Sequence, residues 1–469
     1  MKIRIDNNEY EASEKETILD VCRREGIKIP TLCHMKGVHE GVCRICLVEN
    51  SGKLMTSCNT KACPQMDIVT QSENISRARK INLELLWADH AGKCATCKKN
   101  RRCELQNLTM LQKVENFRFV PKKEDLTQEE ELDLLKDNRM RVVVDEGNSA
   151  ISRTTELCVE CRRCINVCPT KELSFNNRSG DVVVGTPYQK PLDCIFCGQC
   201  VKNCPTGGIT DKNDLDEILE KLDDPKKMAV ALFDPALLES MSLEQPEIES
   251  QRKLVGTLKA VGFEAVFDLA FGMEIFIEKT IEKIKGNQSN NLILSHCPSL
   301  KLYIEKYFPE FSKNIIDVLT PDELMAIFVK TEYAKKNKIN PKDIVVVSIS
   351  SCVAKKIKKD TSLDYVITMR EFGRTIRKKN IKISEVEGEE FSRDISPKNK
   401  EVSKMTRCGG AAEMIAREMG IEYIQANGVK DIKNIFISLR KKRIETKIIE
   451  AMICPGGCVG GGGQSNNIL

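Results

Sequence analysis

Two cysteines stand among six glycines in the stretch Glu450-Ala-Met-Ile-Cys454-Pro-Gly-Gly-Cys458-Val-Gly-Gly-Gly-Gly-Gln464. Glycine adopts φ > 0 without strain and lets the backbone approach a bulky ligand closely. The stretch therefore indicates main chain that wraps tightly around a ligand held by two thiolates. The alternative is a flexible glycine-rich linker with an incidental cysteine pair. The rest of the chain favours the ligand site, because it supplies several further groups of cysteines.

The composition indicates a multidomain protein with metal or redox chemistry. The chain has 469 residues, 22 of them cysteine, and a net charge of +5 with both signs interspersed. It contains no apolar run of about 18 residues, so no membrane span is expected. Its first residues lack the apolar core of a signal peptide and a twin-arginine motif. Many cysteines without a secretion signal favour metal binding in a reducing cytoplasm, and the charge gives no case for nucleic acid.

Residues 1–78 are expected to form a small β-rich domain with strands at Lys2 and Asp67 and a helix over Ile18–Glu25. Its candidate ligands follow a lone Cys, C-x2-C, lone Cys order: Cys33, Cys43, Cys46 and Cys58. This order resembles a plant-type, β-grasp [2Fe–2S] ferredoxin module with a lengthened first loop. Zinc is the alternative. Cys22 is interpreted as a buried apolar residue. Cys63 has no assigned role and could compete as a ligand.

Residues 79–118 contain one histidine with three cysteines, His90-x3-Cys94-x2-Cys97-x5-Cys103, after a helix over Ile81–Asp89. The alternative is a zinc site with three cysteine ligands and one histidine. Because the group lies between iron–sulfur motifs, it more closely resembles the His-ligated [4Fe–4S] module of complex I's large peripheral subunit and of iron hydrogenases. Residues 119–150 are highly charged and lack cysteine, so we expect a helical connector there.

Residues 151–212 carry an internal repeat. Cys158-x2-Cys161-x2-Cys164-x3-Cys168-Pro recurs as Cys194-x2-Cys197-x2-Cys200-x3-Cys204-Pro. In this bacterial two-cluster ferredoxin pattern the fourth cysteine of each run ligates the other cluster. We therefore expect one [4Fe–4S] cluster on Cys158, Cys161, Cys164 and Cys204. A second would bind Cys194, Cys197, Cys200 and Cys168, close to the first and suited to electron relay.

Residues 213–469 alternate apolar strand-like runs with amphipathic helices, which is typical of an α/β domain with mainly parallel sheets. The expected strands are 228–233, 292–294, 344–349 and 365–367, and the expected helices are 252–261, 272–285 and 411–419. Five cysteines are spread along this part of the chain: Cys297, Cys352, Cys408, Cys454 and Cys458. Four of them would suffice for one more [4Fe–4S] cluster.

Three segments resemble the active-site motifs of the iron-only (di-iron, [FeFe]) hydrogenases. They are Leu294-Ser-His-Cys297-Pro-Ser-Leu-Lys-Leu-Tyr-Ile-Glu-Lys-Tyr-Phe-Pro309-Glu310, Ser351-Cys352-Val-Ala-Lys355-Lys356, and Met452-Ile-Cys454-Pro-Gly-Gly-Cys458 with Gly461-Gly-Gly-Gln464. Asp268-Leu-Ala-Phe-Gly272 and Cys408-Gly-Gly-Ala-Ala-Glu-Met also match family segments. The resemblance covers nearly the whole chain and its accessory modules.

The resemblance implies an H-cluster, in which a [4Fe–4S] cluster is bridged to a di-iron centre carrying CO, CN⁻ and a dithiolate amine. The implied ligands are Cys297, Cys352, Cys454 and Cys458, with Cys458 as the bridge. Lys355 would donate a hydrogen bond to a cyanide, and Met452 would lie against the di-iron unit. With Cys22, Cys63 and Cys408 unassigned, the other 19 cysteines and His90 supply 20 ligands for five clusters of four ligands each.

Several positions depart from the family pattern. His296 replaces the cysteine that passes protons to the cofactor, so we identify a divergent subgroup and predict that His296 relays protons. Asp234-Pro235 replaces Ala-Pro, and Ser350-Ser351 replaces Met-Pro. Two relay glutamates are expected as Glu278 and Glu282 on one helix face, one residue out of phase.

The expected function is a cytoplasmic, ferredoxin-type iron hydrogenase that interconverts H2 with protons and electrons. Partners would be a soluble ferredoxin or a redox subunit, together with maturation proteins. The alternative is an H2 or redox sensor, or a slow electron-transfer protein with an altered proton route. A cluster-assembly protein is disfavoured because the accessory modules and Cys458 are intact. Complex I's large subunit shares the first two modules but not residues 292–464.

Overall fold

The computed structural model describes residues 1–469 except 39, 89, 91–93, 95–96, 116, 120–147, 149, 155–156, 176–181, 185–193, 213, 242–246, 358–361, 393–394 and 465–469. The chain divides into two compact units. The N-terminal unit comprises Met1–Gly147, Ser152–Leu192 and Asn203–Thr210; the C-terminal unit comprises Asn148–Ile151, Asp193–Lys202 and Asp211–Leu469. The predicted connector over 119–150 lies almost wholly outside the described residues. No helix among the described residues is both long and apolar enough to cross a bilayer.

The N-terminal unit begins with a five-stranded mixed sheet in the order β2-β1-β5-β3-β4. Its strands are β1 (Lys2–Ile5), β2 (Asn8–Glu11), β3 (Leu47–Asn50), β4 (Lys53–Thr56) and β5 (Asp67–Val69). Helix α1 (Ile18–Arg24) starts with a capping box, in which Thr17 and Asp20 each bond the other's backbone N–H. Ile18 and Leu19 of α1 join the core beneath the sheet. The predicted strands and helix of this domain are confirmed.

Two further helices of this unit are α2 (Glu73–Ala88) and α3 (Glu104–Leu111). The helix predicted from Ile81 is the second half of α2, whose earlier turns are too polar to show a clear apolar stripe. Arg163, the first residue of α5 (Arg163–Val167), binds both carboxylate oxygens of Glu104 at 2.8 and 2.9 Å. Short strand pairs complete the region: β6 (Ile151–Arg153) with β9 (Ile209–Asp211), and β7 (Leu173–Phe175) with β8 (Val182–Val184).

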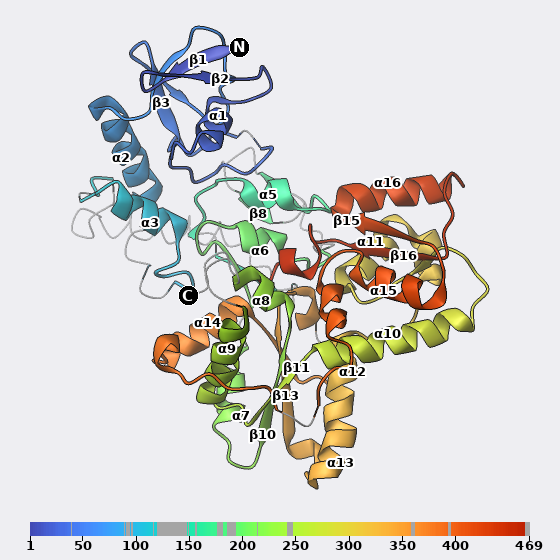
Figure 1. The fold of residues 1–469 in the computed structure, drawn as a ribbon. Coiled ribbons are helices and arrows are strands. Elements are labelled where there is room, and N and C mark those ends of the chain that lie inside the picture. The colour runs from blue at the N-terminus through green and yellow to red at the C-terminus, as the bar shows by residue number, and fades with distance from the viewer. Residues whose placement is uncertain are drawn as a thin grey trace, which may run out of the picture. The chain divides into compact units, whose positions relative to one another are not determined.

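The C-terminal unit contains a parallel four-stranded sheet in the order β11-β10-β13-β14. Its strands are β10 (Met228–Phe233), β11 (Ala265–Asp268), β13 (Ile344–Ser350) and β14 (Tyr365–Thr368). Every residue of β13 is buried, as expected for a parallel sheet covered on both faces. Figure 1 shows α7, α9 and α14 on one side and α10, α12 and α13 on the other. These helices are α7 (Leu215–Leu222), α9 (Glu247–Val261), α10 (Ala270–Lys285), α12 (Pro321–Phe328), α13 (Ala334–Asn337) and α14 (Met369–Lys378).

A second parallel sheet, β12-β16-β15, lies in the same unit. Its strands are β12 (Leu292–Ile293), β15 (Tyr423–Asn427) and β16 (Ile448–Met452). Further helices are α8 (Ala236–Met241), α11 (Pro298–Tyr307), α15 (Gly410–Met419) and α16 (Gly428–Arg440). The predicted α/β alternation is confirmed. Because ligands of such sheets bind beyond the carboxyl ends of parallel strands, the cysteines that follow β12, β13 and β16 mark the candidate site.

Three cysteines of the second ferredoxin-type motif, Cys194, Cys197 and Cys200, group with the C-terminal unit, whereas Cys204 groups with the N-terminal unit. Ile195 and Cys197 are part of a hydrophobic core with Ile293 and Ile449 of the second sheet. Cys200 of this motif lies in the short helix α6 (Gln199–Asn203), and Cys204 follows the helix. Apolar packing therefore ties this cysteine run to the α/β domain.

Candidate active site

Each of the four cysteines at the candidate site is delivered by a separate turn. Cys297 caps α11 after β12, and Cys352 follows the end of β13. Cys454 follows β16, and Cys458 opens the 3-10 turn η10 (Cys458–Gly460). The burial of the sites raises the pKa of all four thiols, to about 12 for Cys352 and about 11 for Cys454. All four cysteines are partly exposed by accessible area.

The four thiols are close enough to repel one another as thiolates. The charge of Cys297 adds to the rise in pKa of Cys352, Cys454 and Cys458, after the larger effect of burial. Thiolates gathered in this way need a bound cation, because a metal keeps a coordinating thiol deprotonated. The donor set is therefore that of a soft-metal or iron–sulfur site.

Hydrogen-bond donors are already directed at the sulfur atoms. The backbone N–H groups of Ser299, Leu300 and Ile453 donate to Cys297 Sγ. The side chain of Gln199 and the N–H of Gly462 donate to Cys454 Sγ. Such bonds stabilise thiolates and tune the potential of bound clusters, so these residues fit a [4Fe–4S] cluster.

The glycines of the C-terminal loop are required by close contacts between backbones. A Cβ at Gly461 would collide with the carbonyl oxygen of Ser351, and one at Gly462 with that of Cys197. The loop is also held by Gln199 Nε2 and Lys202 Nζ, which donate to Gly460 O at 2.9 and 3.1 Å. The glycine stretch is thus packed backbone between the second motif and the ferredoxin-type motif, which excludes the flexible-linker alternative.

His296 is buried, and its Nε2 lies 3.5 Å from Oε1 of the fully buried Glu450. Neither imidazole nitrogen nor Glu450 Oε1 has a hydrogen-bond partner among the described residues. The Phe276 ring packs edge-on against the imidazole at 5.4 Å between centroids. Glu450 Oε2 is fixed by the N–H of Ala412 at 2.7 Å. The structure thus gives His296 a buried carboxylate neighbour that the sequence motifs did not indicate.

Glu278 and Glu282, predicted as relay residues, do share one face of α10, but that face is exposed. Phe276 and Ile281 occupy the buried side of the helix instead. The structure therefore does not bring either glutamate to His296. The out-of-phase alignment explains this result, because the apolar residues of α10 determine which face enters the core.

Lys355, predicted as a cyanide donor, has a side chain that is 9% exposed, and it forms an ion pair with the fully buried Asp322. Burial alone would lower the pKa of Lys355, but Asp322 and then Asp234 hold it well above its usual value. A pocket of about 520 Å³ is lined in part by Lys355, Pro298 and Thr320. Met452, predicted to lie against the cofactor, is buried at the end of β16.

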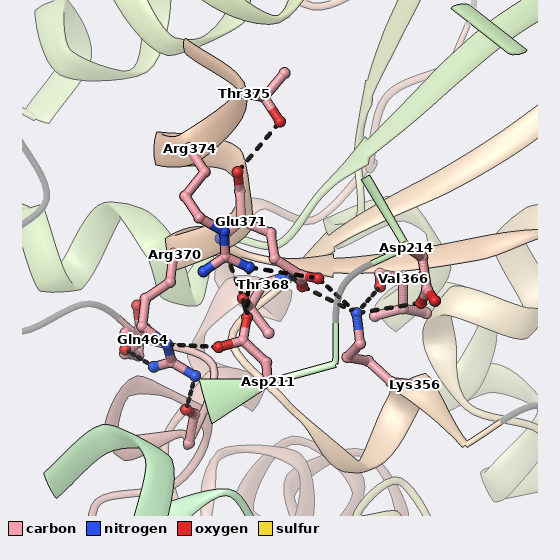
Figure 2. Close-up of polar contacts among 11 residues, drawn as sticks. Asp211, Asp214, Lys356, Val366, Thr368, Arg370, Glu371, Arg374, Thr375 and Gln464 are labelled. Atoms are coloured by element: carbon pink, nitrogen blue, oxygen red, sulfur yellow. Dashed lines mark hydrogen bonds and ion pairs between the residues drawn. The ribbon is translucent and has the colours of Figure 1, made fainter. Parts of the chain in front are cut away.

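Lys356 belongs to a separate buried ionic network (Figure 2). Its ammonium donates to both carboxylate oxygens of Glu371, at 2.9 and 3.0 Å. Arg370 donates to Asp211 Oδ1 at 3.1 Å and to the carbonyl oxygens of Gly462, at 2.7 Å, and Gln464. The network therefore also holds the C-terminal glycine loop, through the carbonyl oxygens of Gly462 and Gln464. Its members are separated by up to 253 residues in the sequence, from Asp211 to Gln464, and no motif predicted their contacts.

The first predicted ferredoxin-type cluster has its four cysteines at one place. Cys158, Cys161, Cys164 and Cys204 line a single pocket of the N-terminal unit. Among the described residues, no three candidate ligands converge tightly enough to surround a single ion, so the cysteines border a space instead. Of the second predicted set, Cys194, Cys197 and Cys200 lie in the C-terminal unit and Cys168 in the N-terminal unit, so that set stays a prediction.

The predicted [2Fe–2S] ligands are also brought together. Cys33, Cys43, Cys46 and Cys58 are all buried. Hydrogen bonds from Cys43 and Cys58 lower the pKa of Cys33 to about 6 and of Cys46 to about 7, and raise the pKa of the donors.

Cys22 and Cys63, the two cysteines of this domain without a predicted cluster, lie in different environments. Cys22 is fully buried in α1, and burial raises its pKa to about 12, in agreement with an apolar role. Cys63 is exposed, and its Sγ donates to Lys61 O at 3.7 Å. It therefore offers no buried thiol to the predicted cluster.

The group of one histidine and three cysteines is described in part. His90 is buried, and the charge of Cys97 adds to the burial-driven rise in pKa of Cys94 and Cys103. Cys103 shares a hydrophobic cluster with Cys33, Cys43 and Cys161, so candidate ligands of three modules pack together within the N-terminal unit. Cys408, also unassigned, donates from Sγ to Ala426 O at 3.2 Å.

Comparison with known families assigns a description to each part of the chain. Residues 227–462 match the iron only hydrogenase large subunit, C-terminal domain. Residues 1–73 match a 2Fe-2S iron-sulfur cluster binding domain, 79–118 the NADH-ubiquinone oxidoreductase-G iron-sulfur binding region, and 157–208 a 4Fe-4S dicluster domain.

Two curated relatives align with nearly the whole chain. Iron hydrogenase 1 of Clostridium pasteurianum is 27% identical over 98% of this chain and 88% of its own. A NADP-reducing hydrogenase subunit of Solidesulfovibrio fructosivorans is 27% identical over 99% of this chain and 88% of its own. A solved [FeFe]-hydrogenase variant of Chlamydomonas reinhardtii superposes with a TM-score of 0.45 and 21% identity, covering 55% of this chain and 85% of that one. By its matched domains, the chain belongs to the iron-only hydrogenase family and carries N-terminal iron–sulfur domains.

Proposed function

We propose that this protein is an iron-only hydrogenase that interconverts H2 with protons and electrons. The observation that carries the proposal is the convergence of Cys297, Cys352, Cys454 and Cys458 from four separate turns. Their mutual charge effects and the N–H donors directed at sulfur support a [4Fe–4S] cluster on these four ligands. Cys458 is proposed to bridge this cluster to the di-iron centre, with its CO, CN⁻ and dithiolate amine.

The di-iron centre would supply the site at which H2 is split or formed, and the protein holds and surrounds it. Lys355 is proposed to donate to a cyanide, because a buried ammonium is a strong donor to an anion. Met452 would contribute an apolar wall. His296 is proposed to carry protons, since it is next to the ligand Cys297 and its buried nitrogens lack partners among the described residues.

Electrons are proposed to pass along one [2Fe–2S] and three accessory [4Fe–4S] clusters. Contact between the ferredoxin-type motif and the glycine loop supports the last step, because Gln199 donates both to Cys454 Sγ and to Gly460 O. The packing of Cys33, Cys103 and Cys161 in one cluster supports the earlier steps. The electron partner is proposed to be a ferredoxin or a redox subunit, and maturation proteins would insert the di-iron centre.

An infrared spectrum of anaerobically matured protein tests the proposal. Stretching bands of CO and CN⁻ are expected, together with an iron content of about 20 atoms per chain, from one rhomb, four cubanes and the di-iron centre. Absence of the bands from protein that contains all of its iron–sulfur clusters would refute the assignment of the active site.

The second candidate is a protein of the same family with little turnover, such as an H2 or redox sensor. The exposure of Glu278 and Glu282 favours it, because the buried relay expected next to the cofactor is then missing on α10. The two candidates differ in rate, not in spectrum. Cofactor bands with H2 oxidation about a thousandfold below the roughly 1–1,000 per second usual for enzymes would support sensing.

A further inference from the structure

Lys355 has a carboxylate partner that no sequence motif predicts. Asp322 and Lys355 form an ion pair in which the carboxylate side chain is fully buried and the lysine side chain is 9% exposed. Among the described residues, Asp322 carries the one carboxylate within ion-pair distance of this ammonium. The neighbouring Lys356 differs, because Glu371 and the carbonyl of Val366 take up its donors.

Asp322 is itself fixed by the fold. It lies in the first turn of α12, where the helix dipole favours a negative charge. Its Oδ1 accepts a hydrogen bond from Ser348 Oγ at 2.5 Å. Ser348 is a buried residue of β13, the strand that leads directly to Cys352. The carboxylate is therefore held by the same strand that delivers one of the candidate ligands.

A role in stabilising the fold alone does not explain this pair. Burying two opposite charges costs desolvation, and apolar residues of similar volume usually stabilise a core as well or better. The pair also belongs to the site by position, because Lys355 lies in the turn that begins with the candidate ligand Cys352. A carboxylate that moves or neutralises Lys355 thus changes the charge next to this candidate ligand.

We infer that Asp322 is a positioning residue of the active site, which fixes the Lys355 ammonium and limits the positive charge and hydrogen bonding that it offers to the cofactor. The inference rests on the proposed function, because it needs the di-iron centre next to Lys355. Asp322 Oδ2 has no hydrogen-bond partner among the described residues, so the ion pair with Lys355 is its polar contact and fixes where the ammonium lies.

The test is the infrared spectrum of matured Asp322→Asn protein in one defined redox state. Asparagine keeps the shape and can still accept from Ser348, but it removes the counter-charge. We expect the cyanide bands to be displaced from those of the unmodified protein. Asp322→Glu, which restores the charge, should bring them back toward their original positions.

A double variant separates positioning from general damage. If Asp322 acts through Lys355, Asp322→Asn should displace the cyanide bands no further in a Lys355→Met background. The matched control is Asp364→Asn, which neutralises the partner of Lys330 in the same pocket and should leave the bands unmoved. Unmoved bands in Asp322→Asn, or an equal displacement without Lys355, would overturn the inference.

Failure of the proposed function can be distinguished from failure of the ion pair. Unmodified protein that shows no CO or CN⁻ bands would refute the proposed function and not this ion pair. If Asp322→Asn acquires no di-iron centre, the ion pair is tested instead by thermal unfolding of the protein before maturation. A midpoint that falls in Asp322→Asn and recovers in the double variant supports the pair, and an unchanged midpoint refutes it.

Discussion

Asp234 accepts two hydrogen bonds from Ser351, one from the hydroxyl at 2.8 Å and one from the backbone N–H at 3.2 Å. Both residues are buried, and they are 117 positions apart in the sequence. Each stands where the sequence departs from the pattern of the family it resembles. The two departures therefore form one hydrogen-bonded pair, located between the ends of β10 and β13 and next to Cys352.

The first prediction concerns this pair. Asp234→Ala and Ser351→Ala should each destabilise the protein. The first leaves the buried hydroxyl and N–H of Ser351 without this acceptor, and the second removes one of the two hydrogen bonds to Asp234 Oδ2. The double variant should lose less free energy of unfolding than the two single variants lose together. The difference, which is the coupling free energy of the pair, should be about 0.5–3 kcal/mol. The measurement is denaturant unfolding of the unmodified protein and the three variants, monitored with a probe in the C-terminal unit. Strict additivity would mean that the contact contributes nothing.

The second prediction tests the ligand set. Cys458→Ser should abolish H2 oxidation and the CO and CN⁻ bands, because the bridge to the di-iron centre is lost. The electron paramagnetic resonance signals of the N-terminal clusters should persist, since their ligands lie in other segments. Cys63→Ser is the matched control, because it removes an exposed thiol that belongs to no predicted cluster. Activity retained in Cys458→Ser would show that another residue forms the bridge.

The third prediction concerns His296. His296→Ala should lower the rate of H2 oxidation at least about tenfold, within the usual range for a positioned acid–base group. The substitution also takes away the imidazole that lies 3.5 Å from the buried Glu450 Oε1, so the unfolding midpoint should fall as well. Initial rates over a range of pH provide the measurement. If the variant reacts as fast as the unmodified protein at every pH, His296 does not relay protons and they enter by another route.

The fourth prediction is a pH dependence of stability. Burial raises the pKa of Asp268 from 3.8 to about 6, partly offset by the N–H of Ala270, while the charge of Asp234 adds to the rise. A raised carboxyl pKa contributes stability that is complete below about pH 4 and is lost as the pH rises through about 6.

Asp268→Asn removes this dependence and keeps the acceptor for Ala270. The variant should therefore gain on the order of 2–3 kcal/mol relative to the unmodified protein between about pH 4 and pH 7. Unfolding curves at the two pH values measure the difference. An equal effect of the substitution at both pH values would mean that the carboxyl titrates normally in the folded state.

Much of the fold was predictable because it depends on local patterns. The strand over 228–233 matches β10 residue for residue, since a parallel strand buried on both faces is a continuous apolar run. The cysteine spacing likewise predicted the set that lines the ferredoxin-type pocket. Helical spacing correctly placed Glu278 and Glu282 on one face, but it does not say which face is buried.

The polar contacts of the site were not predictable in the same way. Asp322 with Lys355, and His296 with Glu450, join residues from different elements whose packing no local pattern encodes. The packing of the second cysteine run was not predictable for a related reason. The second cysteine run reads as part of a ferredoxin repeat, but Ile195 and Cys197 pack in the core of the C-terminal unit.

The clamp on the glycine loop has a consequence for how the protein is made. A chain emerges from the ribosome from its N-terminus onward, and domains generally fold in that order. Residues 460–464 follow every other ligand-bearing segment, yet Arg370, Gln199 and Lys202 all donate to carbonyl oxygens of this loop. Until the loop is synthesised, a buried arginine and two residues of the ferredoxin-type motif lack these acceptors. We therefore expect the C-terminal unit to close after translation of the loop, so that cofactor insertion follows synthesis of the complete site.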